Sequence, residues 1–485
     1  MSRSQSWSLE MSADDSVPDA PPATTGDGSV IALPGARLIL DPRAPYDIAR
    51  DFVRRHHQCG THRTLHHHNG VFYSWSGRHY PEADEMALRA KLYAFLDGAL
   101  RRNADAVVPF KPTRANVNDV LDAVKAVTNL DSSIRAPTWL GHAPMPADEI
   151  VPCRNGLLHL LSGQLLAHTA EFFVHNVLQF DYDANAPPPS EWLNFLNGLW
   201  PDDGESIAAL QELFGLCLTA DTRYQKAFLI VGPRRSGKGT IARVLRGLIG
   251  PENVVGPTIS SLGERFGMAA LIGKRVACIS DARISKRADL DKLAEHLLSI
   301  TGEDTQTVDR KYLSPWTGQL QVRFVILSNE IPEFDERSGA LASRFIVMSL
   351  TRSFLGREDL ELTKKLLGEL PGILNWAIVG WRRLSERGYF IQPASGADVV
   401  QELVNLSSPI REFVKERCEV GPGRSIECGR LYKQWREWNH QRDRFFVPPI
   451  NLFSRDLRAA VPGLIVTQPR KDGKQVRVLD GIGLR

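Results

Sequence analysis

AFLIVGPRRSGKGTIARVLRGLIG, from Ala227 to Gly250, is the stretch that decides the expected fold. Its apolar first residues end at Gly232, a glycine-bounded loop follows, and from Thr240 apolar residues recur at helical spacing. An apolar run rich in branched residues predicts a buried strand, and the later spacing predicts an amphipathic helix. The order of strand, glycine loop and helix predicts an α/β domain.

The loop fits the pattern G-x-x-x-x-G-K through Gly232, Gly237 and Lys238. In such a loop, backbone N–H groups turn toward phosphate oxygens, the lysine reaches the β and γ phosphates, and the helix N-terminus adds its dipole. We therefore predict binding of ATP with Mg²⁺. The predicted contact residues are Gly232, Pro233, Arg234, Arg235, Ser236, Gly237, Lys238, Gly239 and Thr240. A plain glycine turn is the alternative, and it leaves Lys238 unexplained.

One position departs from the pattern. Gly239 follows Lys238, where a serine or threonine usually holds magnesium. Either Thr240 serves as the metal ligand or the ion is held through water.

Three polar residues follow or precede apolar runs farther along the chain. Asp281 ends the expected strand at 275–280 and is predicted to hold magnesium. Asn329 ends the next strand, RFVILSN, and is predicted to sense the γ-phosphate. Arg344 precedes a further strand and is predicted to reach the nucleotide site of a neighbouring subunit. The alternatives are a capping aspartate, an Asx turn before Pro332, and a surface ion pair.

Composition restricts the class of protein. The 485 residues suggest about three domains. A net charge of +3 means that any affinity for nucleic acid must come from local basic patches. Six scattered cysteines without a C-x-x-C pair argue against a zinc ribbon and a disulfide framework, and no signal peptide or apolar run long enough for a bilayer is seen. We expect a soluble cytoplasmic protein without a membrane partner.

Changes in composition and in apolar spacing along the chain predict its division into domains. Residues 1–33 are rich in Ser, Asp, Pro and Gly and are expected to form a disordered tail. An α+β domain is expected over 34–205, the ATPase core over 206–350, and a helical segment over 351–395. The last part, 396–485, reads as three short helices and a basic hairpin with Asp472-Gly473 at its turn, which suggests a winged helix.

Two features of the 34–205 region predict local structure. Asn155-Gly156 and Ser162-Gly163 lie between apolar residues and signal a β-hairpin, and a helix is expected near Glu191 after three prolines. The stretch HHQCGTHRTLHHH, from His56 to His68, contains histidines and a cysteine, which are zinc ligands. Their spacing, however, does not form the two ligand pairs that a zinc site needs. A polar hairpin edge is the simpler interpretation.

Two basic hairpins are candidates for DNA contact. Arg310 and Lys311 precede Tyr312 in an alternating stretch, an arrangement suited to gripping a phosphodiester strand and stacking a base. Lys471 and Lys474 flank the turn of the C-terminal hairpin. By sequence alone, a charged solvated hairpin is the better description of the first, and it is the position of this hairpin among the other motifs that favours DNA contact.

The series GPRRSGKGT, ACISDAR, TGEDTQTVDRK and ILSNEIPEFDERSGALASRF resembles the superfamily 3 helicases, in particular the phage, plasmid and poxvirus primase-helicases. RNGLLHLLSGQLLAHTAEFFVHNVLQF also looks like the domain that precedes their ATPase, and SSPIREFVKERC looks like part of their DNA-binding segment. The resemblance implies an AAA+-like core in a hexameric ring that hydrolyses ATP between subunits and unwinds forked DNA while moving 3′ to 5′ on a single strand. It assigns Lys238 and Thr240 to phosphate and magnesium, Asp281 to the acidic motif, Asn329 to the sensor and Arg344 to the inter-subunit arginine.

Two departures from that family affect the expected chemistry. Ala282 follows Asp281 where many members have a second acid, so Glu330 is another candidate for activating water. The first 140 residues show no zinc-binding cysteines and no acidic triad, so we expect a helicase without primase that works with a separate primase or polymerase.

Two other functions fit parts of the sequence. A DNA-bound ATPase that acts as a loader or regulator would bind ATP and DNA without unwinding. A small-molecule kinase can also carry GKGT, but it has no use for the basic C-terminal hairpin or for Arg344.

Overall fold

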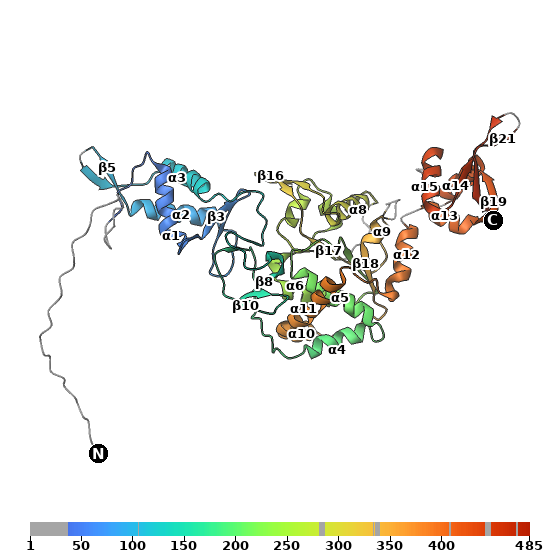
Figure 1. Cartoon of the computed structure of the whole chain (residues 1–485), viewed down its shortest axis with the longest axis horizontal. Coiled ribbons are helices and arrows are strands. Elements are labelled where there is room, and N and C mark those ends of the chain that lie inside the picture. The colour runs from blue at the N-terminus through green and yellow to red at the C-terminus, as the bar shows by residue number, and fades with distance from the viewer. Residues whose placement is uncertain are drawn as a thin grey trace, which may run out of the picture.

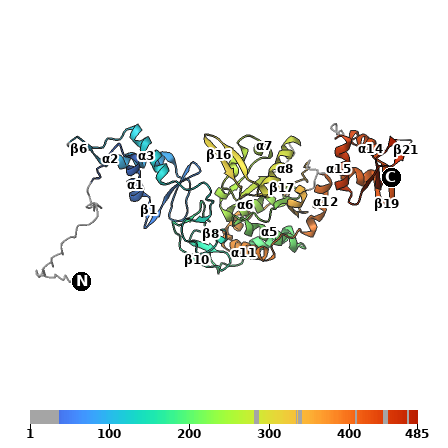
Figure 2. The same cartoon turned by 45° about the horizontal axis from the view of Figure 1, so that its top comes forward.

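The computed structural model describes residues 37–485 except 105, 281–286, 333, 335–339, 407–408, 442–447 and 472–473. The expected disordered tail therefore lies outside the described residues. Three bodies follow one another along the chain, with the amino-terminal helices at one end, a large α/β body in the middle and a small C-terminal body at the other end (Figures 1 and 2).

A parallel sheet of five strands forms the centre of the middle body. Its order is β13 (Val254–Val255), β14 (Val276–Ser280), β17 (Arg323–Ser328), β12 (Ala227–Val231) and β18 (Phe345–Ser349). All the pairs are parallel, and Val231 lies between Ser328 and Ser349. The α/β prediction is confirmed, as are the strands expected near 227–231, 275–280 and 323–328.

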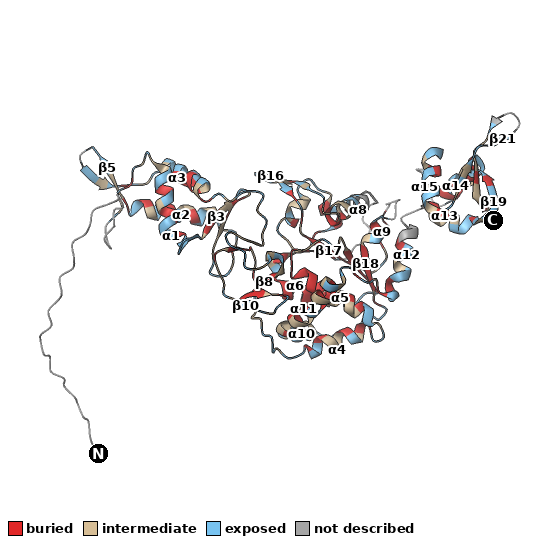
Figure 3. Cartoon of the chain, in the orientation of Figure 1, coloured by how far each residue is buried: buried red, intermediate tan, exposed pale blue. Residues whose placement is uncertain are grey.

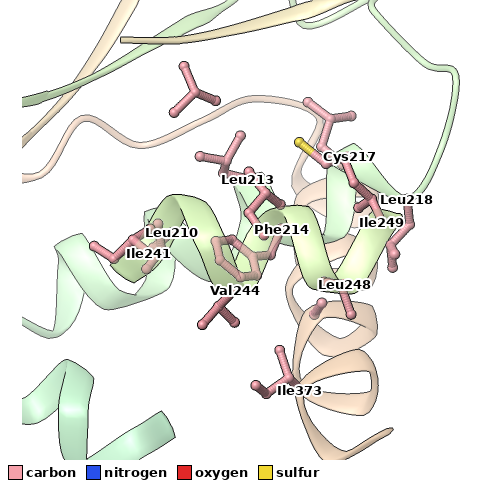
Figure 4. Close-up of a cluster of buried hydrophobic side chains, with 14 of the residues drawn as sticks. Leu210, Leu213, Phe214, Cys217, Leu218, Ile241, Val244, Leu248, Ile249 and Ile373 are labelled. Atoms are coloured by element: carbon pink, nitrogen blue, oxygen red, sulfur yellow. The ribbon is translucent and has the colours of Figure 1, made fainter. Parts of the chain in front are cut away.

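Both faces of the sheet are buried, as expected for parallel strands (Figure 3). Phe228 and Ile230 face one hydrophobic cluster, while Leu229 faces the other. The first cluster includes side chains of α5 (Gly204–Cys217), α6 (Lys238–Ile249) and α11 (Leu370–Arg387), and the second includes side chains of α8 (Arg287–Thr301) and α9 (Ala340–Arg344). Figure 4 shows Leu213 and Phe214 of α5 beside Val244 of α6.

The region before the sheet divides its packing between two cores. Helices α1 (Pro45–His56), α2 (Glu85–Asp97) and α3 (Arg114–Val127) share a core of their own. By contrast, Val151, Leu158 and Trp192 belong to the cluster that contains α5 and α6. The residues just before 205 are thus packed against the middle body.

The local elements expected in this region are present. β8 (Ile150–Cys153) pairs antiparallel with β9 (Gly156–His159) around Arg154-Asn155, and β9 pairs with β10 (Leu165–Leu166), so the predicted hairpins are confirmed. The helix expected near Glu191 is α4 (Ser190–Leu199). Its Trp192 and Leu196 are fully buried, which explains the apolar spacing.

The C-terminal body contains the three expected helices, α13 (Pro409–Arg417), α14 (Cys428–His440) and α15 (Ile450–Ala460). Its sheet has the order β19 (Cys418–Glu427), β23 (Val478–Leu484) and β20 (Ile465–Thr467). Strands of the expected hairpin are therefore present as β20 and β23, with β21 (Arg470–Lys471) and β22 (Lys474–Gln475) farther along it. The expected turn at Asp472-Gly473 lies outside the described residues. β19 was missed because its CEVGPGRSIE has glycine and proline in the middle, which normally interrupt a strand.

The histidine-rich segment forms the expected hairpin. β1 (Gln58–Cys59) pairs with β2 (His62–Arg63), and β3 (Leu65–His68) pairs with β4 (Val71–Ser74). His66 is buried against Tyr80 and Phe173, and neither of its ring nitrogens has a hydrogen-bond partner among the residues that the structure describes. Within the described ranges, no three His, Cys, Asp or Glu side chains gather where they could hold a metal ion.

Among the helices of the described residues, none is both long and apolar enough to cross a lipid bilayer.

Gly215 lets α5 and α11 approach closely, and its replacement should weaken the middle body. A Cβ at this position would lie 2.4 Å from the carbonyl oxygen of Ala377 and 2.7 Å from Cβ of Trp381. We expect Gly215→Ala to destabilise the fold by about 1–3 kcal/mol, as overpacked cores do. The matched control is Gly198→Ala in α4, where a Cβ meets nothing and helix propensity favours alanine by up to about 1 kcal/mol. Urea midpoints of the two variants would show the contrast, and equal midpoints would contradict it.

Buried His66 should make the amino-terminal hairpins sensitive to acid. Burial, and then the charge of Arg63, lower the pKa of His66 to about 4. The stability that comes from burying neutral His66 is fully present above the unfolded-state pKa of about 6.5. It is lost as the pH falls toward 4, because the unfolded chain binds the proton more readily. From pH 7 to pH 5, we expect β3 and β4 to lose about 1–2 kcal/mol of protection against hydrogen exchange, after correction for intrinsic rates.

His66→Leu should remove much of that pH dependence, whereas His142→Leu, at an exposed position, should leave it intact. The same pH dependence in both variants would assign the effect to other groups.

Candidate functional site

The glycine loop connects β12 to α6 at the carboxyl edge of the sheet. Gly237 has φ +93°, and a Cβ there would lie 3.0 Å from a methyl group of Leu199 and 3.2 Å from the ring of Phe195. At Gly232, a Cβ would lie 2.6 Å from the carbonyl oxygen of Leu350. The two pattern glycines are thus required by the backbone conformation and by close packing.

Lys238 connects the loop to a neighbouring strand. Its Nζ donates hydrogen bonds to the carbonyl oxygens of Gly232 and Pro233 at 2.6 and 2.8 Å, and to Oγ of Ser236 at 3.2 Å. It also donates to Oδ1 of Asn329 at 3.0 Å. The ammonium group of the loop and the amide of Asn329 therefore share one site, although they are 91 residues apart in sequence.

Strand pairing explains why Asn329 is there. β17 pairs with β12 so that Ser328 lies beside Val231, and the N–H of Gly232 donates to the carbonyl oxygen of Ser328 at 3.2 Å. Residues that follow the two strands consequently emerge at the same edge. β14 ends at the same edge because Ser280 pairs with Leu327, but Asp281 lies outside the described residues.

The predicted magnesium ligand Thr240 lies in the first turn of α6. Its Oγ1 accepts a hydrogen bond of 3.0 Å from the Arg243 guanidinium, which also donates to Oγ1 of Thr363. A hydroxyl oxygen has two lone pairs, so one remains for a cation or a water. Thr240 thus keeps one acceptor position, and the Arg243 guanidinium is a nearby positive charge that the sequence pattern does not include.

The outer side of the loop is held by the segment after β18. Oγ of Ser353 donates to the carbonyl oxygen of Arg234 at 2.8 Å. The N–H of Phe354 donates to the carbonyl oxygen of Arg235 at 3.0 Å. Arg235, at φ +60°, also forms an ion pair of 3.4 Å with Glu358. These contacts were missed because nothing in the sequence connects positions more than one hundred residues apart.

Arg344 lies at the opposite edge of the same sheet. It precedes β18, whose first residue Phe345 pairs with Ala227 at the start of β12, whereas the loop begins after the end of β12. A five-residue strand spans about 16 Å, which is farther than an arginine side chain reaches. The guanidinium of Arg344 donates instead to Oε1 of Gln225. Arg344 therefore cannot reach the loop of its own chain.

The expected hairpin of residues 306–318 is β15 (Gln306–Arg310) and β16 (Leu313–Gly318). Tyr312 at its tip is 92% exposed, and Nζ of Lys311 lies 5.1 Å from the centre of its ring. Arg310 is placed differently. Its Nε donates to the carbonyl oxygen of Ser314 at 2.9 Å. Its Nη1 donates to the carbonyl oxygen of Asn69 in the amino-terminal body, also at 2.9 Å.

The backbones of Lys471 and Lys474 pair across β21 and β22. Both views place this hairpin far from β16 (Figures 1 and 2). The structure thus brings Lys238 and Asn329 together and keeps the two basic hairpins apart.

Two family models match parts of the chain. Residues 50–201 match the model described as "D5 N terminal like". Residues 230–344 match a family of unknown function, DUF5906, and include the loop, Asn329 and Arg344. The first match is to a domain of the phage and viral primase-helicase type, and it supports the resemblance to primase-helicases seen in the sequence.

Among solved structures, the chain is similar to "The apo structure of NrS-1 C terminal region (305-718)", with 13% identity, a TM-score of 0.50, and coverage of 91% of this chain and 99% of that one. "The A form apo structure of NrS-1 C terminal region-CTR" matches with 12% identity, a TM-score of 0.46, and coverage of 86% and 95%. At this identity, the first likeness shows a shared fold.

Proposed function

We propose that this protein is an ATP-dependent DNA helicase of a phage, prophage or plasmid replication system, acting as a ring of superfamily 3 type. One observation carries the proposal: Lys238 and Asn329 meet at one edge of the sheet while Arg344 lies at the other. If subunits join edge to edge in a ring, the arginine of one subunit lies beside the loop of the next. The arrangement suits hydrolysis of ATP between subunits.

In this proposal, the loop from Gly232 to Thr240 holds the phosphates of ATP through its N–H groups. Lys238 exchanges its carbonyl partners for phosphate oxygens and remains beside Asn329, whose amide orients the attacking water. Thr240 and Asp281 would hold Mg²⁺, which neutralises charge on the phosphates when bound. Arg344 of the adjacent subunit stabilises the charge that develops during transfer.

DNA contact is assigned to two places. Lys311 and Tyr312 at the β15–β16 tip combine a cation with an exposed ring, which is the combination that single strands require. The C-terminal body, with three helices and the hairpin that carries Lys471 and Lys474, is proposed to bind DNA as a winged helix. A separate primase or polymerase would supply primers.

The proposal predicts complementation between inactive variants. Lys238→Ala and Arg344→Ala should each lower ATP hydrolysis by about a thousandfold and abolish unwinding of forked DNA. Mixed in equal amounts, they should recover roughly a quarter of the wild-type ATPase rate, because each interface then draws its lysine and its arginine from two subunits at random. Arg223→Ala, an exposed arginine near the same edge as Arg344, is the matched control and should remain active.

No recovery on mixing would refute action between subunits. DNA-stimulated hydrolysis by the wild type without strand separation would instead identify a loader or a DNA-bound regulator.

Tyr312 should contribute to affinity for single-stranded DNA through stacking. Tyr312→Ala should weaken binding of a poly-thymidine strand by about 1–3 kcal/mol, measured by fluorescence anisotropy at fixed salt. Tyr389→Ala removes another exposed ring, 62% accessible, and should leave the affinity unchanged. Equal affinities of wild type and Tyr312→Ala would remove the hairpin tip from the DNA path.

A further inference from the structure

A cavity of about 720 Å³ lies between the amino-terminal and middle bodies. Its walls come from the β3–β4 hairpin, from the 174–179 segment, and from residues just before β14 and β17. Those strand starts form the edge of the sheet opposite the glycine loop. The volume is in the range of small-ligand sites, roughly 300–1,000 Å³. This cavity is therefore separate from the proposed ATP site.

Positive charge predominates among the side chains that line the cavity. The cations are Arg135, Lys274, Arg275 and Arg310, and the carboxylates are Glu82 and Glu252. Three of the four cations are already hydrogen-bonded within the walls. Arg135 donates to Oε1 of Gln319, Lys274 to the carbonyl oxygen of Glu252, and Arg310 to that of Asn69.

Arg275 is the exception. Its N–H donates to the carbonyl oxygen of Asn253, and its own carbonyl oxygen accepts from the N–H of Arg323, so its backbone is fixed at the start of β14. Its guanidinium makes no hydrogen bond to any described residue, and NH1 is shielded from solvent. The adjacent Arg323 differs, because its guanidinium donates to the carbonyl oxygens of Thr219 and Asp221.

The charge of Arg275 is retained at neutral pH. Burial, and then the charge of Arg323, lower the pKa of Arg275 to about 9, which still leaves it protonated at pH 7. A buried charge without a partner is unfavourable, and an anion is the ligand that offsets this most directly. A guanidinium also matches the geometry of phosphate oxygens.

A second unsatisfied group and two aromatic rings line the same cavity. Nε2 of His175 is buried and has no hydrogen-bond partner within the described ranges. The His175 ring stacks on Tyr73 with centres 4.3 Å apart and planes 5° from parallel, and Trp316 also lines the cavity. The cavity thus combines a hydrogen-bonding nitrogen, a free guanidinium and flat apolar surface, which together suit the phosphate and the base of a nucleotide.

We propose that this cavity binds one nucleotide unit, with its phosphate on Arg275 and His175, either as a free mononucleotide or as part of a single strand that passes between the two bodies.

The test uses the full chain with Lys238→Ala, which disables the glycine loop, and isothermal titration with thymidine monophosphate, a tetranucleotide of thymidine, and thymidine. We expect one saturable site per chain for a phosphate-bearing probe and none for thymidine. Adding Arg275→Met should lower that affinity roughly tenfold or more, as loss of a charge-assisted contact does. Arg223→Met, outside the cavity, should leave it unchanged.

The two phosphate probes distinguish the sources. Tighter binding of the monophosphate indicates a free nucleotide, and tighter binding of the tetranucleotide indicates a strand; either one supports the site if it depends on Arg275. Absence of binding by both, or equal binding with and without Arg275→Met, overturns the proposal. If Arg275→Met does not fold, thermal stabilisation by the probes replaces the titration. The monophosphate, but not thymidine, must then raise the melting temperature of the Lys238→Ala chain. None of these outcomes depends on ATP hydrolysis or unwinding.

Discussion

The shared direction of the five strands is the constraint on which the rest of the structure depends. Because the strands are parallel, their carboxyl ends form one edge and their amino ends the other. The first edge carries the glycine loop, with Lys238 hydrogen-bonded to Asn329. The second edge carries Arg344 and Arg275, whose guanidinium has no hydrogen-bond partner in the part of the chain that the structure describes. The sheet separates two groups of charged residues by the length of a strand, and the proposals above accordingly give them different ligands or different subunits.

The amino-terminal body is positioned against the second edge. Arg310 from the β15–β16 hairpin donates to Asn69, and Arg135 donates to Gln319, so hydrogen bonds from both bodies cross the boundary beside the cavity. The same hairpin presents Lys311 and Tyr312 to solvent. A change in how the two bodies contact each other would therefore alter the surroundings of the proposed DNA-binding tip. This gives the "D5 N terminal like" region a structural connection to the middle body, the proposed ATPase core.

Local chemistry explains which features could be predicted. The loop between β12 and α6 was recognisable because glycine, lysine and the flanking apolar periods are encoded within about twenty residues. The helices of the C-terminal body were recognisable for the same reason. β19 was missed because Gly421, Pro422 and Gly423 hide its pairing with β23, which is a long-range property. Other contacts also join residues that are distant in sequence. Ser353 and Glu358 contact the loop, and Arg310 hydrogen-bonds to Asn69.

Sequence alone was enough to predict the strand–loop–helix unit, the order of the polar residues that follow the strands, and the likeness to primase-helicases. Only the tertiary structure shows that Asn329 meets Lys238, that Arg344 cannot serve its own loop, and that Arg275 lines a cavity without a hydrogen-bond partner among the described residues. The physical reason is that propensity and motif act over a few neighbouring residues. Strand order, register and the packing of one body on another bring together groups that no local pattern connects.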